Sequence, residues 1–402
     1  MVTIVNNRMF TFVTQNLVMD YLQLFNKYKE VHVNGRYITL SHIEGLLQTK
    51  NRKNALKIIG CSVLSKPIYN LTYGTGNRKI LMWSQMHGNE STTTKALFDL
   101  FNFLDSDEPF SIEIKRNFTI FFVPMLNPDG AEIYTRENAD GIDLNRDAQV
   151  LSQPESQILR KLFDDYKPDF CFNLHDQRTI YGVGDSNLPA TISLLAPAYS
   201  EARDFSKSRN TAISVICKIN TELQKHIPGQ VGRYDDSFNP NCVGDTFQMF
   251  GVPTILVEAG HYHEDYDREV TRKFVFMTYL TSFRAIIENV IVPNVFEDYV
   301  RIPLNKTSFL DIIYKNVIFN YDNTYKSINF GVQFIEKLNN KAIEFDAQIA
   351  DIDIEDRFFG HKIYDCENVN LDSNLDSFLK IGHSATFLLA NGTKFVNGLI
   401  II

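Results

Sequence analysis

His87 and Glu90 stand three residues apart in the segment QMHGNE, and a pair of this kind could bind one metal ion. Imidazole nitrogen and carboxylate oxygen are both good zinc ligands, and a catalytic zinc takes three protein ligands and keeps one position open for water. Pairs with this spacing also arise by chance in a chain with 9 His and 48 acidic residues. The alternative is a histidine packed in a turn beside a helix-capping glutamate, so the metal interpretation requires a third ligand.

Two further residues with suitable chemistry end apolar runs later in the chain. His175 follows the run 170–174, and Glu258 follows the run 253–257. Because His175 and His87 both end strands that we expect in one sheet, they can converge on one ion. A carboxylate at the end of a buried strand is unfavourable unless it is paired or functional, and a zinc hydrolase needs one as general base. The alternatives are a structural histidine and a glutamate satisfied by an arginine or by backbone donors.

A polar segment between these candidates could bind a substrate carboxylate. It follows the turn NPDG and contains Arg136 and, ten residues later, Arg146 beside Asn145. Arginine presents a planar fork of donors that suits bidentate binding of a carboxylate. A loop of this length without a function is uncommon, which favours the carboxylate clamp. The alternative is a solvated loop in which the arginines pair with acidic neighbours such as Glu132, Asp140 or Asp147.

Strands that alternate with helices are expected to position these residues. Strand-like runs cover 56–63, 67–73, 79–86, 117–126, 169–174, 192–196 and 254–257. Helical patterns cover 15–30, 91–104, 154–166, 199–225 and 267–290. His87 and Glu90 then fall where a strand ends and a helix begins, which is the usual place for a site in an open α/β sheet. The alternation predicts an α/β sheet that is covered by helices on both faces.

The pattern changes near Pro293. Short alternating runs follow at 317–320, 331–336, 342–350, 385–389 and 395–402, with turn residues between them. We therefore predict a catalytic domain of residues 1–292 and an all-β accessory domain of residues 293–402.

Composition restricts the partners and the compartment. The net charge of -8 argues against nucleic acid as a partner, because a phosphate binder needs a basic face. Five cysteines without a C-x-x-C pair predict no disulfide framework. Residues 1–8 do not begin an apolar signal segment, and no stretch could span a membrane. The chain as given is expected to be cytoplasmic, although a removed signal would leave no trace; composition leaves the oligomeric state undecided.

Together these motifs resemble the zinc carboxypeptidases of the carboxypeptidase A type, family M14. The H-x-x-E pair, NPDG, the arginine loop with DLNR, the strand-terminal His and the strand-terminal Glu occur in the family's order over residues 40–290. The resemblance implies a mixed eight-stranded sheet with helices on both faces and one zinc ion per chain. It also implies hydrolysis of the C-terminal peptide bond of a peptide with a free carboxylate. Some members carry a β-sandwich after the catalytic domain, so we expect the C-terminal region to be sandwich-like.

The resemblance also implies roles at the metal. His87, Glu90 and His175 are implied as the zinc ligands. Asp143 matches the acid that holds His87 through its second ring nitrogen and so fixes its tautomer and orientation.

Further roles concern the substrate. Glu258 is implied as the general base for a zinc-activated water, and Arg136 as the group that polarises the scissile carbonyl. Asn145 and Arg146 match the pair that binds the terminal carboxylate, and Tyr234 is a match for a mobile tyrosine that covers the substrate.

Some residues depart from the family's usual sequence. Asp245 lies where the leaving side chain is read and could select a cationic group, but we favour a helix cap. The segment Asp176-Gln177-Arg178 is not that of the digestive enzymes. Arg178 and Arg233 could add cationic contacts to an acidic substrate.

Three functions therefore compete. The first is a zinc carboxypeptidase. The second is a related M14-type amidase that acts on cell-wall muropeptides or on other N-acyl amino acids. The third is a binding protein that has lost catalysis; the presence of all three ligands, the base and the arginine disfavours it. A structural zinc is also disfavoured, because structural sites are usually closed and rich in cysteine.

Overall fold

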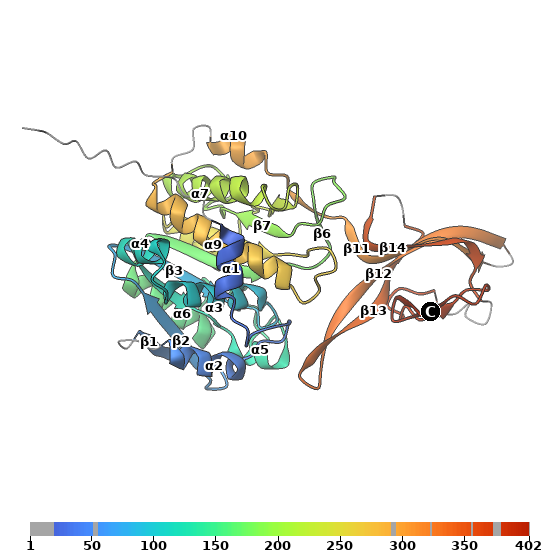
Figure 1. Cartoon of the computed structure of the whole chain (residues 1–402), viewed down its shortest axis with the longest axis horizontal. Coiled ribbons are helices and arrows are strands. Elements are labelled where there is room, and N and C mark those ends of the chain that lie inside the picture. The colour runs from blue at the N-terminus through green and yellow to red at the C-terminus, as the bar shows by residue number, and fades with distance from the viewer. Residues whose placement is uncertain are drawn as a thin grey trace, which may run out of the picture.

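The computed structural model describes residues 20–50, 55–290, 295–321, 324–354, 357–372 and 379–401. A mixed sheet forms the centre of the larger part of the molecule (Figure 1). It has eight strands in the order β1-β2-β4-β3-β5-β9-β7-β8. The strands are β1 (Leu56–Cys61), β2 (Pro67–Tyr73), β3 (Arg78–Ser84), β4 (Phe118–Val123), β5 (Phe170–Asp176), β7 (Ile192–Leu195), β8 (Val231–Arg233) and β9 (Thr254–Ala259).

Helices cover both faces of this sheet, as expected. Successive side chains of a strand point to opposite faces. In β3, Ile80 and Met82 accordingly join one buried core, and Leu81 and Trp83 join another. The first core includes α1 (Tyr21–Tyr28), α2 (Leu40–Thr49), α3 (Thr92–Leu104), α4 (Pro109–Asn117), α7 (Lys207–Leu223) and α9 (Glu269–Ile287). The second core includes α6 (Pro154–Tyr166) and α8 (Val243–Met249).

The four central strands run parallel, and this places the site. β3 pairs in parallel with β4 and β5, and β5 pairs in parallel with β9. The carboxyl ends of parallel strands meet at one edge of the sheet. Ser84 therefore lies opposite Leu174, and His175 lies opposite Glu258 on the neighbouring strand.

Several expected elements have the predicted bounds, and others are shorter. The helix over 154–166 and the strand over 67–73 match α6 and β2. The helix expected over 15–30 is present as α1, which covers Tyr21–Tyr28. Residues 15–19 of the expected helix lie outside the described residues. The helix expected from residue 199 begins only at Lys207, because the Ser206 hydroxyl accepts the Arg209 N–H and caps it. The strand expected to reach residue 86 ends at Ser84, where Gln85 adopts a positive φ of 49°.

The C-terminal region is all-β and sandwich-like, as expected. Its two sheets have the orders β13-β12-β11-β14 and β15-β16-β17, and they enclose a common aromatic core around Tyr314. The long strands are β11 (Phe309–Tyr321), β12 (Thr324–Asn339), β13 (Ala342–Ile352) and β14 (Phe359–Asn370), and the short ones are β15 (Phe387–Leu388), β16 (Lys394–Val396) and β17 (Leu399–Ile401). The predicted boundary at 292/293 falls within 291–294, outside the described residues, and stays a prediction.

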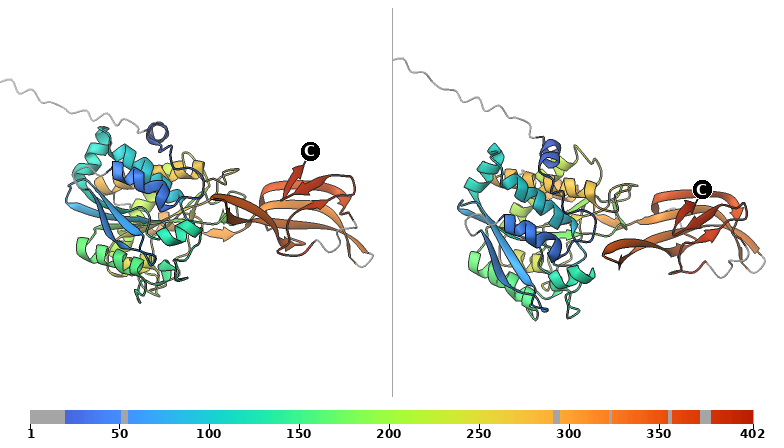
Figure 2. Two further views of the ribbon diagram at one scale, coloured as in Figure 1. Left: turned by 90° about the horizontal axis from the view of Figure 1, so that it is seen from below. Right: turned by 60° about the horizontal axis from the view of Figure 1, so that its bottom comes forward.

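The β region projects from the larger part as a separate lobe, but the two are joined by specific contacts (Figure 2). After α10 (Val295–Val300), β10 (Asn305–Thr307) pairs with β6 (Tyr181–Val183), which follows the metal-ligand strand β5. The buried Asp311 of β11 accepts a hydrogen bond of 2.8 Å from the Tyr266 hydroxyl. None of the helices in the described ranges combines the length and the apolarity needed to cross a membrane.

Candidate metal centre and active site

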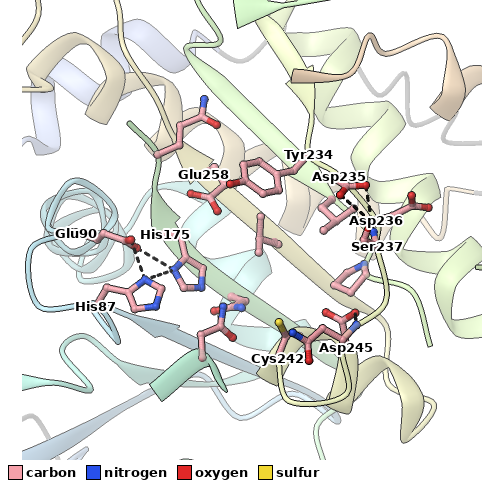
Figure 3. A pocket seen from close by; sticks show the side chains of 18 of the residues that line it. His87, Glu90, His175, Tyr234, Asp235, Asp236, Ser237, Cys242, Asp245 and Glu258 are labelled. Atoms are coloured by element: carbon pink, nitrogen blue, oxygen red, sulfur yellow. Dashed lines mark hydrogen bonds and ion pairs between the residues drawn. The ribbon is translucent and has the colours of Figure 1, made fainter. Parts of the chain in front are cut away.

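Three of the predicted residues form a compact buried cluster. Glu90 Oε1 lies 2.8 Å from His87 Nδ1, and Glu90 Oε2 lies 2.8 Å from His175 Nδ1. The two Nδ1 atoms are 3.2 Å apart, and one ligand atom from each residue lies within 4.8 Å of the others (Figure 3). Within the described part of the chain, this is the one group of three or more His, Cys, Asp or Glu side chains that could hold a metal ion.

The cluster has the chemistry of a zinc site. Two imidazole nitrogens that face one carboxylate at these distances can all donate electron pairs to a single cation, and two nitrogens with one oxygen are a typical ligand set for catalytic zinc. Burial lowers the pKa of His175, which favours the neutral imidazole that a metal requires. The other ring nitrogen of His175 is buried without a hydrogen-bond partner, so only Nδ1 of this ring has a neighbour to bind.

Asp143 and Arg136 hold the cluster from one side. Asp143 Oδ1 lies 3.0 Å from His87 Nε2, which is the contact that the resemblance implies. Asp143 Oδ2 accepts from Arg136 Nε at 3.0 Å, and Arg136 Nη1 lies 3.3 Å from Glu90 Oε1. Burial would raise the pKa of Asp143, but His87 and Arg136 outweigh it and hold that pKa below its usual range. A charged Asp143 can therefore fix the ring orientation of His87.

The NPDG turn braces the metal-binding loop, a function that its sequence did not reveal. Asn127 caps α5 (Pro128–Ile133) by accepting the Gly130 N–H at 2.8 Å. Its amide donates to the carbonyls of Met86 and Glu137, which lie beside the metal-binding pair and beside Arg136. At Gly88 an added Cβ would lie 2.0 Å from the Gly130 carbonyl carbon, so the two loops can touch only because residue 88 is glycine.

A second brace was also missed from the sequence. Asp176, the residue after His175, accepts hydrogen bonds from the Thr92 N–H at 3.0 Å and the Thr92 hydroxyl at 2.6 Å. The Asp176 N–H donates to Glu90 Oε2 at 3.2 Å. These bonds tie the start of α3 to the end of β5, so they fix Glu90 relative to His175. An acidic residue directly after a strand-terminal histidine was the available signal.

Glu258 faces the same cavity at the end of β9 (Figure 3). It is 8% exposed, and burial raises its pKa well above the usual value. Glu90 and Asp176 raise it further, and the nearby arginines do not compensate fully. A carboxylate that holds a proton more firmly than usual is suited to proton transfer near neutral pH.

One cavity of about 540 Å³ brings the predicted residues together. This volume is typical of a binding site for a small molecule or a peptide end. All of the predicted site residues except Asp143 line it, namely His87, Glu90, Arg136, Asn145, Arg146, His175, Tyr234 and Glu258.

The alternative of arginines paired with acids of their own loop holds for Arg136, which pairs with Asp143, but not for Arg146 among the described residues. Arg146 Nη1 donates to the carbonyl of Asn145 at 2.8 Å and lies 3.1 Å from Cys242 Sγ, and it forms no ion pair with any described acid. Asn145 Oδ1 accepts the Val243 N–H at 3.0 Å, which orients its side chain. Cys242 is a cavity residue that the sequence did not indicate.

Two substrate-side expectations, for Asp245 and Tyr234, have different outcomes. Asp245 is not the helix cap that we favoured: Cys242 holds that position in α8, whereas Asp245 lies in the first turn, lines the cavity and accepts the Asn239 N–H at 3.1 Å. Burial raises the pKa of Asp245 to about 6. Tyr234 lines the cavity, and its hydroxyl lies 3.2 Å from that of Tyr181.

Of the two extra arginines, one lines the cavity and the other does not. Arg178 lines the cavity and is exposed. Arg233 does not line it; its guanidinium packs over the Tyr299 ring at 5.1 Å, and Nε donates to the Ile302 carbonyl at 3.4 Å. The expectation that Arg233 contacts the substrate is therefore wrong, because this guanidinium packs against the Tyr299 ring outside the cavity.

Zinc should stabilise the folded protein through this cluster. A ligand that binds only the native state at 100 times its dissociation constant adds about 2.7 kcal/mol. We expect zinc added to the chelator-treated protein to raise Tm in differential scanning calorimetry, and we expect no rise in His175→Ala. The exposed His263 supplies the control, because His263→Ala should keep the full shift. An equal zinc-induced shift in His175→Ala would place the metal elsewhere.

Comparisons with known proteins agree with this geometry. Residues 39–234 match the family model of the zinc carboxypeptidases, Peptidase_M14. A segment of 101 residues, 25% of this chain, is 32% identical to cytosolic carboxypeptidase 2 of Xenopus tropicalis and spans only 10% of that relative.

Solved structures of low sequence identity share the fold. A metallo-carboxypeptidase from Burkholderia cenocepacia has 16% identity and a TM-score of 0.50, over 62% of this chain and 69% of that one. Thrombin activatable fibrinolysis inhibitor has 13% identity and a TM-score of 0.50, over 67% and 81%. With the family match and a cluster that fits zinc, residues 39–234 of this chain belong to the M14 zinc carboxypeptidase family.

Proposed function

We propose that this protein is a zinc-dependent carboxypeptidase that removes the C-terminal residue of a peptide. The observation that carries the proposal is the content of one cavity: a three-residue metal cluster, the Glu258 carboxylate, and the guanidinium of Arg146, which has no acidic partner among the described residues. We propose His87, Glu90 and His175 as the ligands of one zinc ion. Zinc bound there would lower the pKa of a water molecule and polarise a carbonyl group.

The chain's own groups would then perform three tasks. Glu258 takes a proton from the attacking water and later gives it to the leaving nitrogen, for which its buried position and raised pKa suit it. Arg136 donates to the carbonyl oxygen as negative charge develops there. Its link to Asp143 holds the guanidinium in place beside the cluster.

The carboxylate clamp defines which end of the substrate enters the cavity. Arg146 lacks an acidic partner among the described residues, and its neighbour Asn145 is oriented by the Val243 N–H. We propose that the two bind the substrate's terminal carboxylate, with Asp245 beside the leaving side chain. Tyr234 would contact the same end of the substrate.

The proposal is tested with pooled peptides and muropeptides, incubated with and without zinc. We expect zinc-dependent release of single C-terminal residues by the wild-type protein, identified by mass spectrometry. Cleavage confined to muropeptides would favour the related amidase. Metal binding without cleavage of either pool would contradict both enzymes and favour a binding protein.

Substitution of Arg146 should weaken binding of the terminal carboxylate. We expect Arg146→Gln to raise KM for a peptide acid by about 10–100-fold, because a hydrogen bond to a charged group is lost. Steady-state kinetics on the peptide acid measures this effect. Arg301→Gln is a matched control, since that arginine is 75% exposed and pairs only locally with Asp298. An unchanged KM in Arg146→Gln would exclude this clamp.

A further inference from the structure

A second cavity, of about 380 Å³, adjoins the metal centre on the side of the β region. It shares Glu90, Arg136 and residues 176–178 with the first cavity, but it is not lined by Asn145 or Arg146. Its outer wall comes from β12 and β13, through residues 333–336 and Phe345. When the terminal carboxylate of a peptide lies at Asn145 and Arg146, the rest of the peptide must extend past the metal centre, away from those two residues. The second cavity provides space for it there.

The second cavity is lined by charges of both signs, because the carboxylates of Glu90, Asp176 and Glu336 lie among its arginines. Four arginines line it, Arg36, Arg136, Arg178 and Arg268. Two of them have acidic partners, since Arg36 lies 3.1 Å from Glu336 and Arg136 contacts Glu90 and Asp143.

The other two arginines are not neutralised by an ion pair with any described residue. Arg268 is 1% exposed and donates to the carbonyls of Ala259 and Gln177 at 2.7 and 2.8 Å, and its Nε has no partner. Arg178 is exposed, stands at the junction of the two cavities and forms no ion pair with a described acid. Positive charge is therefore available to a ligand at Arg178.

The β region holds the loop that carries Arg178. The carbonyl of Thr179, the next residue, accepts a hydrogen bond from His361 Nε2 at 2.8 Å, and the Thr179 hydroxyl accepts one from Gln333 Nε2 at 2.7 Å. The Ile180 carbonyl accepts the N–H groups of Ser308 and Phe309, both at 3.1 Å. A loop held by three strands of another sheet, β11, β12 and β14, can present its arginine in a defined position, which is a requirement of a selective site.

We propose that the second cavity binds the residue on the amino side of the scissile bond and that Arg178 selects an acidic side chain there. The proposal rests on the proposed carboxypeptidase function. A substrate carboxylate would give Arg178 the bidentate partner that it lacks. The wall from β12 and β13 makes the C-terminal region part of the substrate site.

Two peptides that differ only at the penultimate position, Glu against Gln, test this selection. We expect wild-type kcat/KM to favour the Glu peptide by about 10-fold or more, the factor that a charged hydrogen bond supplies. In Arg178→Gln the ratio should fall to within about twofold of one, and Arg178→Lys should retain part of it because the charge remains. Arg301→Gln makes the same change on an exposed surface and should keep the wild-type ratio.

A wild-type ratio near one, or an unchanged ratio in Arg178→Gln, would overturn the proposal. If neither peptide is cleaved, the proposed function fails, and the cavity is tested separately. Glu258→Gln protein with zinc is then titrated with each peptide by calorimetry. Tighter binding of the Glu peptide that disappears with Arg178→Gln would support the cavity, and equal affinities would overturn it.

Discussion

Glu258→Gln is expected to lower kcat/KM for release of a C-terminal residue by about 10²–10⁴-fold, the usual contribution of a general base. Glutamine has nearly the same size as glutamate but cannot take a proton from water. Glu258 is not one of the three residues of the metal cluster, so zinc binding should persist. Kinetics on one peptide, with the zinc content of each protein measured in parallel, separates loss of the base from loss of the metal.

A surface carboxylate supplies the control for this experiment. Glu288 lies at the end of α9 with its side chain 46% exposed, and Glu288→Gln should leave both activity and zinc content unchanged. If Glu258→Gln with full zinc occupancy retained activity within about tenfold of wild type, the proton would have to leave by another group, and the role of Glu258 would be wrong.

The sequence was most informative where local pattern and chemistry coincide. His175 and Glu258 end buried strands, and parallel pairing alone brings such ends to one edge of the sheet. The α/β sheet with helices on both faces follows from the alternation of strands and helices, whereas its eight strands were implied by the family resemblance. The metal cluster with Glu258 beside it could therefore be predicted once β3, β5 and β9 were expected in one sheet.

The sequence was least informative where distant segments meet. The wall of the second cavity belongs to β12 and β13, more than a hundred residues after Arg178, and no local periodicity encodes that contact. β14 was missed because its side chains are mostly exposed or half-buried and only Cys366 is buried, so no apolar alternation marks it. The sequence did not show that Asp245 lines the cavity, because its position depends on the path of the loop before α8. We therefore favoured a helix cap.

A buried ion pair supports the helix that follows the metal-binding loop. Arg272 of α9 donates two hydrogen bonds to Asp99 of α3, from Nε to Oδ2 at 2.8 Å and from Nη2 to Oδ1 at 2.6 Å. Both side chains are fully buried. Arg272 also donates to the carbonyls of Glu30 and Val33. The pair therefore joins α3, whose first turn follows Glu90, to α9 and to the segment after α1.

Arg272→Met is expected to reduce the free energy of unfolding by about 3–5 kcal/mol, because it leaves the Asp99 carboxylate buried without a counterion. Arg272→Met/Asp99→Leu should lose less than the single variant, since replacement of both partners by apolar residues removes the unpaired charge. Urea unfolding of the metal-free proteins measures both. Arg284→Met on the same helix, 30% exposed and paired with Glu113, should cost about 1 kcal/mol or less. If Arg272→Met were no more destabilising than Arg284→Met, the contact between α3 and α9 would rest on apolar packing alone, and the buried pair would have no part in holding α3 beside the metal centre.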